Sequence, residues 1–210
     1  MKIIILVLSY DDNDIYSKLY ETQKKTWDSL SVDGVDTYYY FGNGDEDKII
    51  GNTIITTIPE DLFNCGYKTI KAFELIQNLD FDFIFRTNSS SYVDKQRLLD
   101  YSLSLNNTNH YSGVIGFDSG VSFASGCGYF LSKDIMLKII ENKNNVNHSL
   151  NDDVSFGKIL NDNNIFPQSN PRVDVNGNDI SPDYFHYRVK SYDRNNDILK
   201  MFNIFELKNK

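Results

Sequence analysis

Two adjacent carboxylates in the second half of the chain have chemistry that could serve catalysis. Asp152 and Asp153 begin a stretch of helical periodicity that extends to Leu160. Acidic residues are favoured at the start of a helix by the helix dipole, which gives the pair an ordinary structural explanation. A fixed carboxylate is also the kind of group that accepts a proton from an attacking hydroxyl in general base catalysis. The pattern by itself leaves both interpretations open.

A second group of polar residues follows two apolar runs that are typical of buried strands. Ser9-Tyr10-Asp11 follows the run over residues 3–8, and Asn88-Ser89-Ser90 follows the run over residues 81–86. In open α/β sheets, ligands bind beyond the carboxyl ends of the strands. Both groups are therefore candidates for ligand binding, with a simple polar turn as the alternative for residues 88–91.

Basic, glycine and histidine residues complete the set of candidates. Lys68 and Arg86 could each bind an anion, or each could be an ordinary surface cation. The run Ser125-Gly126-Cys127-Gly128 predicts a tight turn, where missing Cβ atoms would let the backbone approach a ligand. His186 lies in an expected strand over residues 184–189, and a partly buried structural histidine is the alternative there.

The elements that would position these residues alternate between strands and helices. In the first half, the period of the apolar residues predicts strands over 3–8, 35–41, 53–58 and 81–86, with helices over 15–30 and 65–79. Strands that alternate with helices favour parallel pairing through crossover connections. We therefore expect an α/β fold with a mostly parallel central sheet and helices on both faces.

The second half is less regular. Helices are predicted over 93–105, from Ser132 onward, over 152–160 and over 198–207, and strands over 111–117, 121–124 and 184–189. Residues 161–183 are expected to form a long surface loop with at most a short strand at 172–175. We expect one domain over residues 1–210, with a nucleotide-binding half over 1–90 and an acceptor and catalytic half over 91–210.

Composition narrows the classes of function. The 210 residues include 21 Lys and Arg against 29 Asp and Glu, a formal net charge of −8, and 40% hydrophobic residues. The acidic balance argues against a nucleic-acid binder, and the apolar content is enough for a packed core. No run approaches the roughly 20 apolar residues that span a bilayer, and the apolar start is short for a signal peptide, so a cytoplasmic protein is expected. The two cysteines are expected to be reduced.

Five segments stand out when they are taken in chain order. They are Lys25-Thr26-Trp27, Asn64-Cys65-Gly66-Tyr67-Lys68-Thr69, Arg86-Thr87-Asn88-Ser89-Ser90, Ser125-Gly126-Cys127-Gly128-Tyr129-Phe130-Leu131-Ser132 and Asp152-Asp153-Val154. Together they resemble the motifs of the family 31 β-1,3-glycosyltransferases and their Fringe-like relatives, which have the GT-A fold. In the same order, that family has an R-x-T-W-like segment, a Y-x-N-L-T-x-K-T helix start, a K-T-D-D-D strand end, an S-G-G-G-Y-x-L-S turn and an E-D-V helix start.

The resemblance implies an enzyme that transfers a hexose from a nucleotide sugar, a UDP-sugar above all, to a hydroxyl acceptor with inversion. Asp153 aligns with the aspartate that acts as general base, and Asp152 stands beside it. A catalytically inactive module of the same fold that binds a nucleotide sugar or a glycan is the alternative. A nucleotide-binding protein unrelated to sugars has less support, because neither G-x-G-x-x-G nor a P-loop occurs.

The resemblance also assigns roles to the other candidates. Ser9, Tyr10 and Asp11 would contact the uracil or the ribose, and Asn88 and Ser90 would lie beside the donor. The diphosphate would meet cations drawn from Lys68, Arg86, His186 and Arg188, with Lys190 as a further possibility. The acceptor or the sugar would lie against Gly126, Cys127, Gly128 and Asp152.

One departure from the family concerns the metal. Its D-x-D carboxylates hold Mn²⁺ or Mg²⁺ against the diphosphate, whereas this chain has Asn88, Ser89 and Ser90 at those positions. Neutral oxygens are poor substitutes for carboxylates on such hard cations. We therefore expect no metal cofactor, with cationic side chains in its place. Weak binding of Mn²⁺ or Mg²⁺ through other groups, His186 included, and a loss of catalysis are the alternatives.

Overall fold

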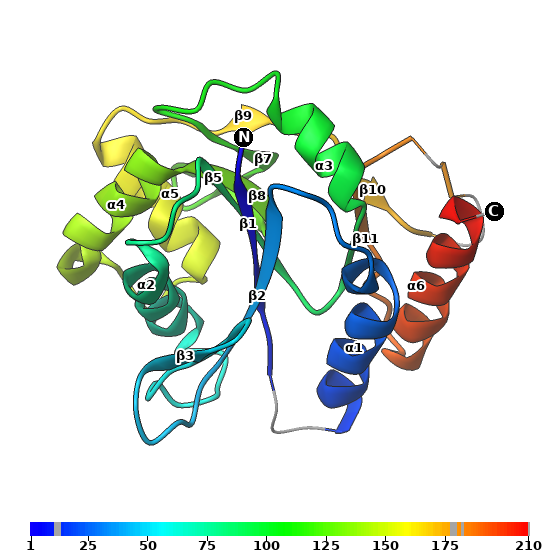
Figure 1. Cartoon of the computed structure of the whole chain (residues 1–210). Coiled ribbons are helices and arrows are strands. Elements are labelled where there is room, and N and C mark those ends of the chain that lie inside the picture. The colour runs from blue at the N-terminus through cyan, green and yellow to red at the C-terminus, as the bar shows by residue number, and fades with distance from the viewer. Residues whose placement is uncertain (11–13, 177–179, 182, 210) are drawn as a thin grey trace.

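The structure is a computed structural model that describes residues 1–10, 14–176, 180–181 and 183–209 (Figure 1). Its main sheet has eight strands in the order β3-β4-β2-β1-β5-β8-β7-β9. The strands are β1 (Ile3–Leu8), β2 (Val35–Phe41), β3 (Lys48–Ile50), β4 (Thr53–Ile55), β5 (Phe83–Asn88), β7 (Tyr111–Asp118), β8 (Val121–Ser132) and β9 (Gln168–Ser169). Among these described strands, four of the seven neighbouring pairs are parallel. The other three are antiparallel.

Helices cover both faces of this sheet, as predicted. Figure 1 shows α2, α4 and α5 on one side and α1, α3 and α6 on the other. The helices are α1 (Asp14–Lys25), α2 (Cys65–Ile76), α3 (Lys95–Ser102), α4 (Lys133–Glu141), α5 (Asp152–Asp162) and α6 (Asn195–Lys208), with short 3-10 helices at η1 (Trp27–Ser29) and η2 (Lys143–Asn145). The α/β class expected from the sequence is confirmed.

The central strand β1 shows why its sequence is apolar without a break. Successive side chains of a strand point to opposite faces. Ile4 and Leu6 belong to the core beneath α2, α4 and α5, whereas Ile3, Ile5 and Val7 belong to the core beneath α1, α3 and α6. A strand with both faces covered needs apolar residues at every position.

The predicted turn at residues 125–128 is wrong. Those residues lie inside β8, a continuous strand in which Gly128 is paired with Thr87 of β5. A Cβ atom on Gly128 would overlap the His186 ring and would lie 2.9 Å from Cζ of Phe85. Gly128 is therefore a glycine because a neighbouring segment packs closely against it. In the sequence, such a glycine looks the same as a glycine in a turn.

Other boundaries also differ. The helix expected over residues 15–30 ends at Lys25 and is followed by η1, and the helix expected over 93–105 is the shorter α3. The strands β3, β6 (Ser91–Val93) and β9 were not predicted, because runs of two or three residues carry little periodicity.

A small second sheet joins distant parts of the chain next to the end of β5. It consists of β10 (Val173–Asp174), β11 (His186–Arg188) and β6 (Ser91–Val93). The antiparallel pairing of β11 with β6 sets Arg188 opposite Ser91. The segment between β11 and α6 is thereby brought to the edge of the main sheet where the polar tripeptide 88–90 lies.

No helix in the described part of the chain combines the length and the apolar character needed to cross a bilayer.

Candidate functional site

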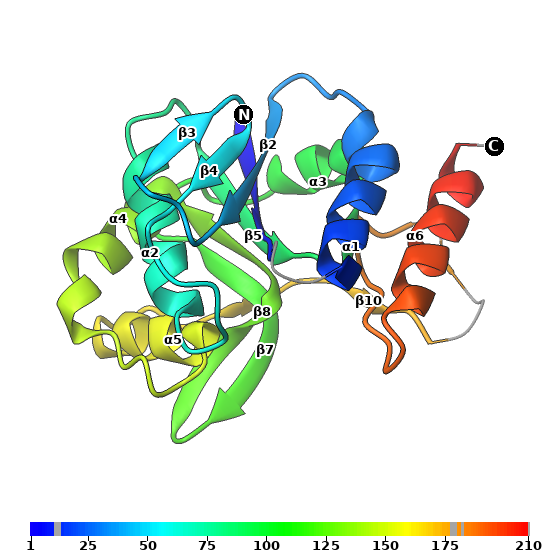
Figure 2. The same cartoon turned by 90° about the horizontal axis from the view of Figure 1, so that it is seen from below.

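A cavity of about 570 Å³ lies at the carboxyl ends of β1 and β5. The two strands run parallel, with Leu8 opposite Asn88, so both end at the same edge of the sheet. β1 runs downward in Figure 1, and Figure 2 therefore faces this edge. Ser9, Tyr10, Asn88 and Ser90 line the cavity together with Ser89, which brings the two polar groups from the sequence to one place.

Tyr10 is the aromatic wall of the cavity. Its ring meets the ring of Tyr16 edge-on, with 5.3 Å between the centroids. Neighbouring Ser9 is buried, and its carbonyl oxygen accepts a hydrogen bond from Nζ of Lys68 at 2.8 Å. Asp11, which was predicted to contact the nucleoside, lies outside the described residues.

Lys68 lies at the cavity wall but is already paired. Its Nζ donates to Glu60 Oε2 at 2.5 Å, and both side chains are 2% exposed. Burial lowers the pKa of Lys68, although the Glu60 carboxylate opposes that shift. The pair therefore brings little net positive charge to a ligand.

Arg86 was predicted to face the diphosphate, and the structure places it inside the protein. Arg86 is 1% exposed and does not line the cavity. Its guanidinium donates to the hydroxyl of Tyr40, to the carbonyl of Gly126 and to the carboxylate of Asp152. Burial acts against the charge, but the Asp152 carboxylate together with Tyr40 and Tyr129 outweighs it, and the pKa of Arg86 stays above its usual value.

Asp153 lies one layer behind the cavity. Its Oδ2 accepts from the backbone N–H of Gly126 at 2.7 Å, and its Oδ1 accepts from the N–H of Val154 at 2.9 Å. The carbonyl of the same Gly126 is 3.4 Å from Nδ2 of Asn88, which lines the cavity. Burial and then the neighbouring Asp152 charge raise the pKa of Asp153, which makes its carboxylate a stronger base.

Asn88, Ser89 and Ser90 at the end of β5 do not suit a divalent metal. Asn88 uses its Oδ1 to accept the N–H of Ser90 at 3.0 Å, and the hydroxyl-bearing Ser89 and Ser90 are buried. Within the described residues, no three His, Cys, Asp or Glu side chains form a group that could hold a metal ion. Hard cations prefer carboxylates, and this strand end offers amide and hydroxyl oxygens only.

His186 and Arg188 do not line the cavity. His186 is 1% exposed, and its Nε2 is 3.1 Å from Oγ of Ser91. Burial, together with the charges of Arg172 and Arg188, lowers the pKa of His186 to about 3, so the ring is neutral at physiological pH. Arg188 is half-buried and lies 3.7 Å from the carboxylate of Asp174. His186 therefore packs behind the residues that line the cavity.

The glycine-rich segment contributes one side chain and two backbone groups. Cys127 lines the cavity, as does Cys65 at the start of α2, and both thiols are free. Gly126 connects Arg86 with Asp153 through its carbonyl and its N–H.

Several residues of the cavity were not among the predicted site residues. They include Cys65, Tyr16 and Arg194. Lys190, which was named as a further possibility for the diphosphate, does line the cavity. Tyr16 and Arg194 lie in segments that read as ordinary helix starts, and only the packing of α1 against α6 brings them to the site (Figure 2).

Comparisons with known proteins identify the fold. No family model and no curated protein matches the chain. Among solved structures, a glycosyltransferase involved in the glycosylation of the major capsid of PBCV-1 is similar over 96% of this chain and 99% of its own, with a TM-score of 0.58 and 14% identity. The galactosyltransferase LgtC, solved with donor and acceptor sugar analogs, is similar over 99% of this chain and 96% of its own, with a TM-score of 0.51 and 11% identity.

The glycosyltransferase GlyE of Streptococcus pneumoniae TIGR4 is also similar, with a TM-score of 0.54 and 12% identity over 92% of this chain. The matched region is 56% of the GlyE chain, so this chain spans about half of GlyE. At these identities the likeness concerns the fold, and the predicted GT-A class is confirmed. The chain has the GT-A fold of glycosyltransferases.

Proposed function

We propose that this protein is a glycosyltransferase that binds a nucleotide sugar in the cavity at the ends of β1 and β5. The observation that carries the proposal is the cavity itself, which lies at the ligand-binding edge of a GT-A sheet and is lined by Tyr10, Ser90 and Lys190. The ring of Tyr10 offers a face on which a nucleobase can stack. A UDP-sugar that carries a hexose is the donor we propose.

The proposed reaction is transfer to a hydroxyl acceptor with inversion. The acceptor oxygen attacks the anomeric carbon on the face opposite the diphosphate, and the bond from that carbon to the diphosphate oxygen breaks. Asp153 takes the proton of the acceptor hydroxyl, a role that suits a carboxylate whose pKa is raised by burial. Gly126 and Cys127 would lie beside the sugar, because Cys127 lines the cavity and Gly126 joins it to Asp153.

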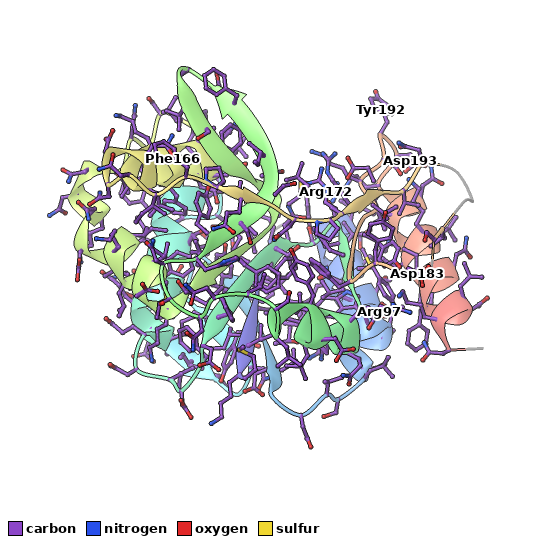
Figure 3. All side chains as sticks on the ribbon, turned by 90° about the horizontal axis from the view of Figure 1, so that it is seen from above. Arg97, Phe166, Arg172, Asp183, Tyr192 and Asp193 are labelled. Carbon is purple, nitrogen blue, oxygen red and sulfur yellow. The ribbon has the colours of Figure 1, made fainter. Side chains whose placement is uncertain are left out.

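The test is a panel of nucleotide sugars, assayed for thermal stabilisation and for release of the nucleoside diphosphate, with and without Mn²⁺ and with EDTA. Tyr10→Ala should abolish the stabilisation, whereas Tyr192→Ala, a fully exposed tyrosine outside the cavity, should leave it unchanged. Figure 3 shows Tyr192 protruding from the segment before α6. The absence of any response to every nucleotide sugar would contradict the proposal.

An inactive binding module of the same fold is the second candidate. It is favoured by one observation, which is that both oxygens of Asp153 accept backbone N–H groups and the side chain does not line the cavity. A module of this kind would bind the nucleotide sugar in the thermal assay and would show neither transfer nor hydrolysis.

For the proposed transferase, nuclear magnetic resonance of the product would decide between inversion and retention.

A further inference from the structure

Three basic side chains line the described walls of the cavity, and they differ in what already neutralises them. Lys68 is buried against Glu60. Lys190 is exposed, and it forms no hydrogen bond or ion pair with any residue that the structure describes. Its charge is therefore fully available to a ligand, unlike that of Lys68.

Backbone hydrogen bonds fix the position of Lys190 beside the end of β5. The N–H of Val189, one residue earlier, donates to the carbonyl of Ser90 at 2.8 Å. One residue later, the N–H of Ser191 donates to the buried carboxylate of Asp197 in α6 at 2.7 Å. The short segment that carries the lysine is thus bonded to the strand end on one side and to α6 on the other.

Arg194 reaches the cavity from the start of α6. Its guanidinium carbon is 5.4 Å from the centroid of the Tyr16 ring, and Tyr16 in turn meets the ring of Tyr10. Nε of Arg194 is 3.3 Å from Oδ2 of Asp197, but its N–H is not aligned with that oxygen and has no hydrogen-bond partner among the described residues. The arginine is held in place by a ring and a carboxylate. Its Nε is buried, and its two other guanidinium nitrogens, which form no hydrogen bond with a described residue, are the donors left for a ligand.

Asp197 forms an ion pair with Arg194, whereas Lys190 has no carboxylate partner among the described residues. Glu60 and Asp61 line the described walls, and Glu60 is committed to Lys68. The end of β5 and the two residues after it contribute no carboxylate, because residues 88–90 are Asn, Ser and Ser. Beside Ser90 the cavity therefore has the unpaired charge of Lys190, and no carboxylate from residues 88–90 opposes it, in a chain whose net charge is −8.

On the basis of the proposed function, we further propose that Lys190 and Arg194 bind the diphosphate of the nucleotide sugar. They would do so in the place where a D-x-D enzyme uses a metal ion. When the bond from the anomeric carbon to the diphosphate breaks, its electron pair stays on the diphosphate oxygen. Fixed cations stabilise the charge that grows there, and Lys and Arg form their strongest hydrogen bonds with such oxygens. The diphosphate lies between Ser90 and Lys190, and the base lies toward Tyr10.

The test is isothermal titration calorimetry in EDTA with UDP, uridine and inorganic pyrophosphate. The variants are Lys190→Met, Arg194→Met and the charge-conserving Lys190→Arg. Lys158→Met is the matched control, since Lys158 is an exposed lysine of α5 away from the cavity. We expect each Met variant to weaken binding of UDP and pyrophosphate by about tenfold or more, because hydrogen bonds to charged groups are strong. Uridine binding should stay unchanged, and Lys190→Arg should restore part of the loss.

The outcomes separate this inference from the proposed function. If UDP binds in EDTA and the Met variants keep the wild-type preference for UDP over uridine, the inference is wrong while the proposed function stands. If UDP binds only when Mn²⁺ or Mg²⁺ is added, a metal holds the diphosphate and the inference is likewise overturned. If the wild-type protein binds none of the nucleotide sugars of the panel, both fail together.

Discussion

Arg86 donates a hydrogen bond to the carboxylate of Asp152, which lies 66 residues later in the chain. The same guanidinium donates to the carbonyl of Gly126, so one side chain of β5 connects β8 with the start of α5. Asp153 follows directly in α5 and accepts the N–H of that glycine. The arginine that was predicted to contact the donor instead supports the residues behind the cavity at the ends of β1 and β5.

Replacing Arg86 should therefore cost stability. Arg86→Met leaves the Asp152 carboxylate without its partner in a largely buried position, where the side chain is 12% exposed. Breaking a buried ion pair by removing one partner typically costs about 3–5 kcal/mol. Urea unfolding followed by circular dichroism measures the loss.

Lys158→Met is the control for this measurement. It removes an exposed ion pair between Lys158 and Asp162 in α5, the helix that begins at Asp152. Such surface pairs contribute roughly 0–1 kcal/mol. Equal stabilities of the two variants would show that the Arg86 pair does not support the fold.

Asp153→Asn should separate binding from transfer. The amide keeps the shape of the side chain but cannot accept a proton, so transfer should fall by about 10²- to 10⁴-fold. Binding of UDP, measured by calorimetry, should remain within about twofold of wild type, since Asp153 does not line the cavity. Unchanged turnover would remove Asp153 from the role of base.

The raised pKa of Asp153 predicts that the transfer rate depends on pH. Burial and Asp152 raise the pKa of Asp153, and only its deprotonated form accepts a proton. The transfer rate of the wild-type protein should therefore rise with pH through this raised pKa, above the ordinary range of an aspartate, and then level off. A rate that is already constant from pH 4 upward would contradict this assignment.

Much of the fold was predictable because its signals are local. The unbroken apolar run of β1 indicates a strand buried on both faces, and the polar residues after β1 and β5 lie at one edge because parallel strands end together. The helix that begins at Asp152 was likewise correct at its first residue.

The partners of the charged residues were not predictable, because they come from distant segments. Nothing near Lys68 in the sequence indicates that Glu60 neutralises it in the interior. Gly128 resembles a turn residue in the sequence, yet its role depends on His186, which packs against it from β11. Arg194 contacts Tyr16 only because α6 lies beside α1. Such pairings depend on the tertiary fold, which local periodicity does not encode.

His186 should make the protein sensitive to acid. Its pKa is lowered to about 3 in the folded protein, against about 6.5 in an unfolded chain. Between these values the unfolded chain binds a proton that the folded protein does not, so stability falls as pH drops from about 6.5 toward 3. The loss attributable to this residue can reach about 1.4 kcal/mol for each pH unit.

The measurement compares urea unfolding of the wild-type protein and His186→Gln from pH 7 to pH 4. The variant lacks the titrating ring, so the difference in stability between the two proteins should shift in favour of the variant as pH falls. A difference that is independent of pH would show that His186 is not buried as a neutral ring.

The two cysteines provide a probe of the cavity that needs no substitution. Cys65 and Cys127 both line it, and they are the chain's two cysteines. UDP should therefore slow alkylation of both thiols by iodoacetamide, as followed by intact mass spectrometry. Burial raises the pKa of Cys65, so its labelling without nucleotide should accelerate as pH rises above neutrality. Uridine-bound and nucleotide-free samples serve as controls, and labelling that is equally fast with saturating UDP would place the nucleotide elsewhere.

The most direct test of the central claim is a crystal structure of the protein with UDP bound in the presence of EDTA. The account predicts the nucleotide in the cavity at the ends of β1 and β5, with the base toward Tyr10 and the diphosphate between Ser90 and Lys190. A nucleotide bound at any other place on the molecule would contradict it.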